Sequence, residues 1–235
     1  MTNCRCRRPC YCYRVVPAFS RQQNQWCTLS EGPPRIDVFR QQPPCRSLFR
    51  KFFLRGDIPI RRNYCRGSRN FIRWCVAPEQ LDLRRYLPLF FDGMCEDTFP
   101  YREFARHGVH DILSVAKEKQ VLCCLPLVIL PMKKALSSKN PDVIIATLRA
   151  IQQLLQVGPC IGRALVPYYR QLLPIVNLFR NFNVNQCDRI DFKGGHRLGD
   201  VIRETLCLME QTGGKDAYLN IKYMVPTYES CVLNR

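Results

Sequence analysis

The segment at residues 140–159, NPDVIIATLRAIQQLLQVGP, carries the start and stop signals of one amphipathic helix. Asn140 suits the N-cap, Pro141 the first helical position, and Gly158-Pro159 the stop. The apolar residues of one helical face recur at i, i+4, i+7 and i+11: Ile144, Leu148, Ile151 and Leu155. Polar Thr147, Gln152, Gln153 and Gln156 lie mostly off this stripe. A one-sided apolar face must be covered by other elements, so we expect helices packed on helices.

A second helix is predicted over LGDVIRETLCLMEQTGG, where Gly213-Gly214 end the pattern. Its apolar stripe consists of Leu198, Val201, Ile202, Thr205, Leu206 and Met209.

Two further segments, residues 125–136 and 166–179, resemble each other. Each begins with an apolar residue and a proline and then meets a second proline, Pro131 or Pro174, that should kink it. The first prolines, Pro126 and Pro167, are 41 residues apart, and armadillo and HEAT repeats recur at about 40–47 residues. The sequence therefore predicts an all-α, armadillo/HEAT-like α-solenoid over residues 81–235. An ordinary helical bundle is the alternative.

The excess positive charge lies in the first third of the chain. Residues 1–85 contain 18 Lys and Arg against 5 Asp and Glu, which gives +13 of the total of +17. We expect residues 1–48 to be a basic, Cys- and Pro-rich extended arm, followed by a lead-in over residues 49–80. Within the lead-in, Ile72, Trp74 and Val76 alternate with Arg73 and Cys75 after a turn at residues 66–68, which predicts a small β-hairpin.

The sequence indicates a protein of a cytosol-like compartment. No apolar signal segment follows the basic start, and the longest apolar run, residues 121–132, is too short to span a bilayer and holds two prolines. The 15 cysteines are scattered and no Asn-x-Ser/Thr acceptor occurs, as expected where thiols stay reduced. We therefore expect no membrane partner.

Candidate sites for chemistry are few. The spacing of Cys4, Cys6, Cys10 and Cys12 is C-x-C-x3-C-x-C, tighter than the usual zinc pairs, which favours a basic tail over a metal site. His107 and His110, beside Asp111, could form a metal or proton-transfer pair, but helix-surface residues are the simpler interpretation. TGGKDAY at residues 212–218 departs from a phosphate loop, and Arg55-Gly56-Asp57 as an adhesion motif conflicts with an intracellular location. We predict no enzyme, no metal and no cofactor.

Binding is then the expected activity, with two classes of acidic partner. An arginine-rich arm can neutralise RNA phosphates, with Phe49, Phe52, Phe53 and Phe71 as stacking platforms. The same arm can dock on an acidic protein lattice. Charge alone does not choose between them.

Four segments closely resemble the parkin co-regulated gene protein (PACRG) family, over about residues 49–234. They read LRGDIPI, LDLRRYLPLFFDGMCEDTFPYREFARHGVHDIL, ALVPYYRQLLPIVNLFRNFNVN and NIKYMVPTYESCVLN. Residues 1–48 match nothing in the family core, and RRNYCRGSRNFIRWCVAP keeps only an Ile-x-Trp-x-Val pattern, so the chain looks like a divergent paralogue.

The resemblance implies an armadillo/HEAT-like, non-enzymatic structural protein of cytoplasmic microtubules, in the axonemes of cilia and flagella. Members sit at the inner junction, where the B-tubule closes onto the A-tubule, and contact α/β-tubulin, a small β-rich inner-junction subunit and other axonemal proteins. On this basis the tubulin lattice becomes the expected partner, nucleic acid the alternative. We predict that the lattice contacts join the arm to the folded body: Arg46, Arg50, Lys51, Arg55, Arg61 and Arg62.

Overall fold

The computed structural model describes residues 14–17, 19–25, 28–30, 37–43, 46–62, 72–182 and 198–232. The chain forms two compact units, residues 1–40 and 41–235. The predicted turn at residues 66–68 and the four early cysteines lie outside the described residues.

The first unit contains a small strand pair that the sequence did not predict. Strands β1 (Arg14–Val16) and β2 (Thr28–Ser30) pair in parallel, and the 3-10 helix η1 (Arg21–Asn24) lies between them in the chain. Val16 is buried, and the Thr28 hydroxyl donates to the carbonyl oxygens of Gln22 and Gln25. These local contacts give part of the expected extended arm a structure of its own.

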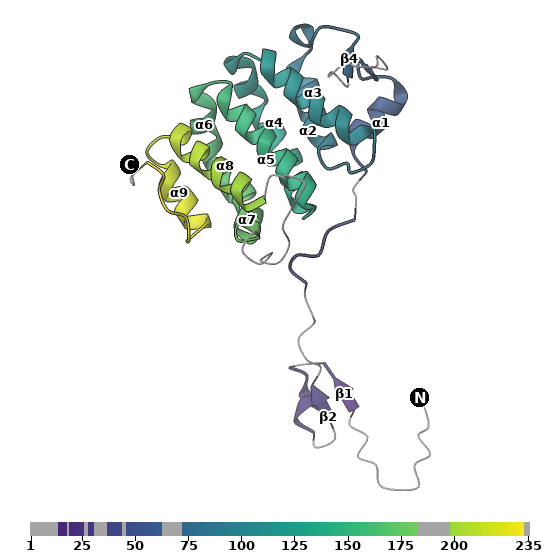
Figure 1. Ribbon diagram of the computed structural model, residues 1–235. Coiled ribbons are helices and arrows are strands. Elements are labelled where there is room, and N and C mark those ends of the chain that lie inside the picture. Colours follow the sequence, from purple (N-terminus) through teal and green to yellow (C-terminus); the bar gives the residue numbers. More distant parts are fainter. Residues whose placement is uncertain are drawn as a thin grey trace, which may run out of the picture. The chain divides into compact units, whose positions relative to one another are not determined.

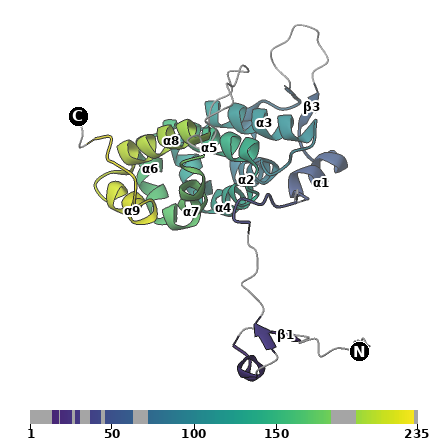
Figure 2. The same cartoon turned by 60° about the horizontal axis from the view of Figure 1, so that its bottom comes forward.

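The second unit is helical and two layers deep. One layer contains α2 (Leu83–Gly93), α4 (Glu118–Ser137), α7 (Tyr169–Phe179) and α9 (Ala217–Met224). The other contains α3 (Tyr101–Val115), α5 (Pro141–Gln156) and α8 (Leu198–Gly213). Figures 1 and 2 show the helices of each layer side by side, each packed on the other layer. The predicted all-α fold class is confirmed.

The predicted equivalence of two proline-containing segments agrees with this arrangement. They lie in α4 and in the run from η3 (Val166–Tyr168) to α7, which pack as neighbours in one layer. A short helix, α6 (Pro159–Leu165), precedes η3. Prolines inside a helix remove a backbone hydrogen bond, and α2, α4 and α7 all carry them: Pro88, Pro126, Pro131 and Pro174.

Helix α5 matches its prediction closely. The Asn140 side chain accepts a hydrogen bond from the Asp142 amide at 3.1 Å, and Pro141 is the first helical residue. The predicted stripe is buried. Thr147 departs from the pattern, since it is fully buried. Its hydroxyl donates to the Val143 carbonyl oxygen at 2.7 Å, which satisfies the buried polar group. Helix α8 buries the whole of its predicted stripe and ends at Gly213, followed by Gly214 at φ +79°.

Helix α4 differs from its prediction in length. It begins at Glu118, not near residue 125, so both of its prolines are interior. Among the described residues it is the helix that is long and apolar enough to cross a membrane, although only by length and composition. Packing against α2, α5, α6 and α7 accounts for that composition, as expected for the central helix of a helical core.

Two smaller elements join the solenoid at its N-terminal end. Helix α1 (Leu48–Arg55) packs on α2, and strands β3 (Ile60–Arg62) and β4 (Ile72–Trp74) form the predicted hairpin, joined in the chain to α2 by the 3-10 helix η2 (Pro78–Gln80). Ile72 is buried and Trp74 half-buried, whereas Val76 lies beyond the strand and is exposed. Both elements lie at the same end of the folded unit (Figures 1 and 2).

Candidate functional site

Helix α1 carries three of the six predicted contact residues, and its apolar side fixes it to the body. Phe49 is completely buried and packs on Phe90, with ring centroids 5.1 Å apart. A side chain at Gly93 would place its Cβ 2.7 Å from Phe49 Cγ, so the glycine makes room for this ring. Phe53 stacks on Phe104 at 5.0 Å. These rings are therefore part of the core, and Phe49 and Phe53 are not exposed stacking platforms for RNA bases.

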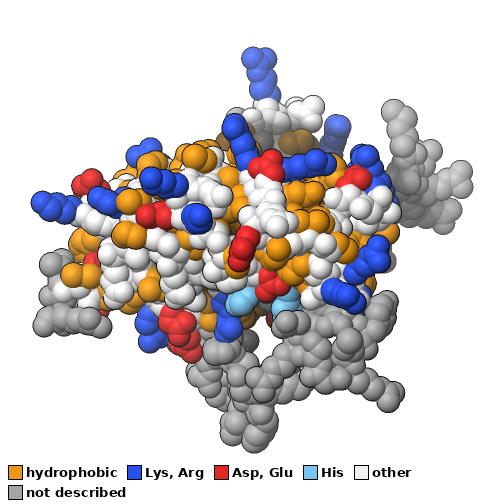
Figure 3. Space-filling view, turned by 90° about the horizontal axis from the view of Figure 1, so that it is seen from above, with side chains coloured by type: hydrophobic (Ala, Val, Ile, Leu, Met, Phe, Trp, Pro, Cys, Tyr) orange, Lys and Arg blue, Asp and Glu red, His pale blue; other side chains and the backbone are white. Residues whose placement is uncertain are grey.

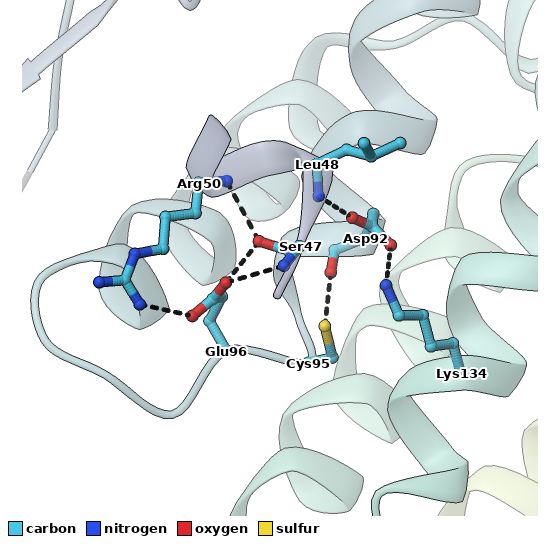
Figure 4. Close-up of polar contacts among 7 residues, drawn as sticks. All are labelled: Ser47, Leu48, Arg50, Asp92, Cys95, Glu96 and Lys134. Carbon is cyan, nitrogen blue, oxygen red and sulfur yellow. Dashed lines mark hydrogen bonds and ion pairs between the residues drawn. The ribbon is translucent and has the colours of Figure 1, made fainter. Parts of the chain in front are cut away.

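Two buried carboxylates hold the first turn of α1 (Figure 4). Glu96 accepts hydrogen bonds from the Ser47 hydroxyl at 2.6 Å and the Ser47 amide at 3.2 Å. Asp92 accepts from the Leu48 amide at 2.6 Å and pairs with Lys134 of α4 at 2.8 Å. Free amides at a helix N-terminus favour negative charge. The two acids therefore fix the position from which α1 presents its outer face.

The outer face of α1 is basic and partly apolar. Lys51, Leu54 and Arg55 are exposed. Arg55 lies 3.2 Å from the Asp57 carboxylate and over the Phe52 ring. Arg46, just before the helix, is also exposed. Predicted lattice contacts Arg46, Lys51 and Arg55 are thus accessible to a partner.

Arg50 is placed differently from the other predicted contacts. Its guanidinium lies over the Tyr101 ring at 4.7 Å, with Nη1 3.9 Å from the buried Glu96 carboxylate. These interactions tie Arg50 to α3 and to the loop after α2. Arg50 thus contributes to holding α1 in place.

The hairpin adds a basic cross-strand pair. Arg61 and Arg62 are exposed on β3, and Arg62 lies over the Phe99 ring at 5.1 Å. Arg61 is directly opposite Arg73 of β4, which is also exposed. Like charges in this position destabilise a hairpin. Arg73 was missed by the sequence analysis because the strand register is needed to place it beside Arg61.

We call the exposed cations of this region the basic edge: Arg46, Lys51, Arg55, Arg61, Arg62 and Arg73. They belong to α1, to the residue shortly before it and to the hairpin of β3 and β4, which lie at one end of the folded unit (Figures 1 and 2). An arrangement of this kind attracts an acidic surface at close range, because the screening length is about 8 Å at physiological salt.

The sequence model of the family described as "Parkin co-regulated protein" matches residues 47–230 of this chain. The chain belongs to the parkin co-regulated protein family. It is also 49% identical over 209 residues to the mouse (Mus musculus) protein named "Parkin coregulated gene protein homolog", an alignment that covers 88% of this chain and 86% of the relative. That share exceeds residues 49–235, so the similarity to this family member extends into the N-terminal segment.

The matched range begins and ends at serines that bind buried carboxylates. Ser47 donates to Glu96, and Ser230 donates to Glu210 of α8. Glu210 also accepts from the Tyr228 hydroxyl at 2.8 Å and the Cys231 amide at 2.9 Å. Although burial opposes ionisation, these hydrogen bonds lower the pKa of Glu210. They fasten residues 228–231, at the end of the family match, to α8.

The remaining candidate residues form no composite site in the described part of the chain. His107 and His110 lie on the outside of α3, 3.8 Å from Glu103 and 3.4 Å from Asp111 respectively. Within that part, no three His, Cys, Asp or Glu side chains are grouped as metal ligands would be. TGGKDAY spans the end of α8, a turn and the start of α9. Arg55 is the last residue of α1, and Gly56 is its C-cap, with φ +81°. The early cysteines lie outside the described residues.

Proposed function

We propose that this protein is a non-enzymatic structural protein of ciliary and flagellar doublet microtubules, which binds tubulin at the inner junction of the A- and B-tubules. The resemblance that implies this role is supported by membership of the family over residues 47–230. On this proposal the protein resides in the axoneme and its neighbours include tubulin and a small β-rich inner-junction subunit.

The observation that carries tubulin binding is the cross-strand pair of Arg61 and Arg73 on an exposed hairpin. Two arginines in register repel each other, so their placement costs stability unless an anionic partner lies against them. An acidic tubulin surface supplies that charge. Figure 3 shows Lys and Arg side chains spread over one face of the molecule, among hydrophobic side chains and fewer Asp and Glu. The solenoid would then supply a rigid body of defined shape.

Co-sedimentation of the full-length protein with stabilised microtubules tests this proposal. The variant Lys51→Gln/Arg61→Gln/Arg73→Gln should bind about tenfold more weakly than wild type, with a smaller dependence on salt. The matched control is Arg170→Gln/Arg203→Gln/Lys215→Gln, which removes the same charge from exposed positions elsewhere. The control should bind nearly as well as wild type.

A truncation tests the contribution of the N-terminal arm to microtubule binding separately from that of the basic edge. Residues 1–40 carry seven arginines against Glu31 and Asp37. Their deletion should lower affinity without unfolding the solenoid, because residues 41–235 form a compact unit of their own. A deletion to residue 48 would also remove the Ser47 cap.

In ciliated cells the tagged full-length protein should fractionate with the axoneme.

Two results would reject the proposal. One is an equal loss of microtubule binding in the edge variant and the control. The other is crosslinking that recovers RNA with a defined sequence motif and no tubulin, which would favour the RNA-binding alternative.

A further inference from the structure

A groove of about 790 Å³ lies between α3 and α5. The α5 residues that line it extend from the first turn of the helix to its last residue: Asp142, Ile145, Ala146, Arg149, Ala150, Gln152, Gln153 and Gln156. At 1.5 Å per residue this face is about 20 Å long. It is a second face of α5, distinct from the buried stripe of Ile144 and Leu148. The groove therefore follows the whole helix.

The groove has an apolar base and a polar margin. Val109 of α3 and Ala150 of α5 are buried, and Ile145 and Ala146 are half-buried. The margin carries Arg149, His110 and the amides of Gln153 and Gln156, and Gln153 Nε2 donates to the His110 carbonyl oxygen at 2.8 Å. Such a surface suits a ligand with both apolar and polar groups.

Arg106 gives the groove its preference for an anion. Its Nε is buried and has no hydrogen-bond partner among the described residues. Its Nη2 donates to a carbonyl oxygen, that of Asp142, at 3.3 Å. Burial, and secondly the charge of Arg102, lower the pKa of Arg106, against the opposing effects of Glu103 and Asp142. A desolvated cation with an unused donor is unfavourable until a carboxylate accepts from it.

We propose that this groove binds a short, extended acidic segment of a partner protein, with a glutamate or aspartate carboxylate on Arg106 and Arg149 and an apolar side chain over Ile145 and Ala146. About six extended residues, at 3.3 Å each, match the length of the groove. A small carboxylic acid would fill only part of it. Asp142 lines one end, so it repels a second carboxylate there and sets the direction of the segment. This surface is separate from the basic edge.

The probe is a fluorescein-labelled peptide of eight residues, glutamate and leucine in alternation, titrated with the full-length protein by fluorescence anisotropy. Saturable binding is expected for wild type and about tenfold weaker binding for Arg106→Gln and for Arg149→Gln, because each loses a charge-assisted hydrogen bond. Arg149 is exposed, so that variant tests the groove even where Arg106→Gln alters folding. A lysine-leucine peptide should not bind.

The matched control variant is Arg203→Gln, an exposed arginine on α8 with a partner, Asp200, at 3.4 Å. It should bind the peptide as wild type does, and so should the basic-edge triple variant, which separates this inference from microtubule binding. A photoreactive group on the peptide should crosslink to α3 and α5. The inference is wrong if wild type shows no saturable binding up to millimolar peptide, if Arg203→Gln loses as much affinity, or if the crosslinks map to the basic edge.

Discussion

At each end of the solenoid, buried carboxylates bind a terminal segment of the fold. The groups that stabilise these carboxylates differ between the two ends. At the N-terminal end, Asp92 and Glu96 bind the first turn of α1. Lys134 of α4 lies beside Asp92 and Arg50 of α1 lies beside Glu96 (Figure 4). At the C-terminal end, Glu210 is held by the neutral donors of residues 228–231. A buried carboxylate can thus be stabilised by an ion pair or by hydrogen bonds alone.

This difference fits the two tasks. The N-terminal end must hold α1, a cationic helix, against the body. Asp92 and Glu96 offset the positive charge of this helix, while Lys51 and Arg55 stay exposed. The C-terminal end has only to fasten a short segment behind α9. Glu96 binds Ser47 and Glu210 binds Ser230, the serines at the two limits of the family match. The family match therefore ends at specific polar contacts, and not where the packing gradually becomes looser.

Replacing Asp92, the carboxylate that pairs with Lys134, should lower the free energy of unfolding more than replacing Glu210. Asp92→Ala leaves the Leu48 amide without this acceptor and Lys134 without its carboxylate, so it should lower the free energy of unfolding by about 2–3 kcal/mol in urea denaturation. Asp97→Ala is the matched control, since it removes an equal charge from an exposed position five residues further along the chain, after the end of α2. It should change stability by less than about 0.5 kcal/mol. Equal effects would show that Asp92 does not hold α1.

The contribution of Glu210, at the C-terminal end, to the free energy of unfolding should depend on pH. The pKa of Glu210 is lowered in the folded state, so below the ordinary carboxyl pKa of about 4.3 the unfolded chain binds the proton first. The stability from Glu210 is complete above that pH and is lost as pH falls through the lowered pKa. Glu210→Gln should cost about 1–3 kcal/mol at pH 7.

Unfolding free energies measured from pH 7 to pH 3 provide the test. The Glu210→Gln variant should lose less stability on acidification than wild type does. Parallel curves for the two proteins would mean that Glu210 does not ionise in its contacts with residues 228–231.

Local signals explain which parts of the fold the sequence could predict. Asn140, Pro141 and Gly158 are start and stop signals readable within a few residues, and α5 matched them. The start of α4 was missed because its first turn precedes the apolar run and is fixed from a distance: Glu118 Oε1 accepts from the Cys160 amide at 2.6 Å. Hydrogen-bond partners 42 residues apart leave no local pattern.

The candidate site shows the same division. Their position between the arm and the folded body indicated Arg46, Lys51, Arg55, Arg61 and Arg62, and the structure leaves all five exposed. The inward contacts of Arg50 and the pairing of Arg73 with Arg61 depend on tertiary contacts and strand register, which position along the chain does not encode. Nor does FFDGMCED reveal that two of its acids are buried, since their partners Leu48 and Ser47 lie 44 and 49 residues away.

The smallest expected effect concerns the thiol beside Glu210. Burial, and then the hydrogen bond from Cys231 Sγ to Glu210 at 3.0 Å, raise the pKa of Cys231 to about 11. Because the thiolate is the reactive form, iodoacetamide at pH 7.5 should alkylate Cys231 far more slowly than the exposed Cys123 of α4. Glu210→Gln removes the charge that favours the protonated thiol, so Cys231 should react up to about tenfold faster, while Cys123 is unchanged. Peptide mass spectrometry over a time course measures both rates in one sample. Equal rates at the two cysteines of the wild-type protein would show that the C-terminal segment opens readily, and that its contacts with Glu210 do not protect the thiol.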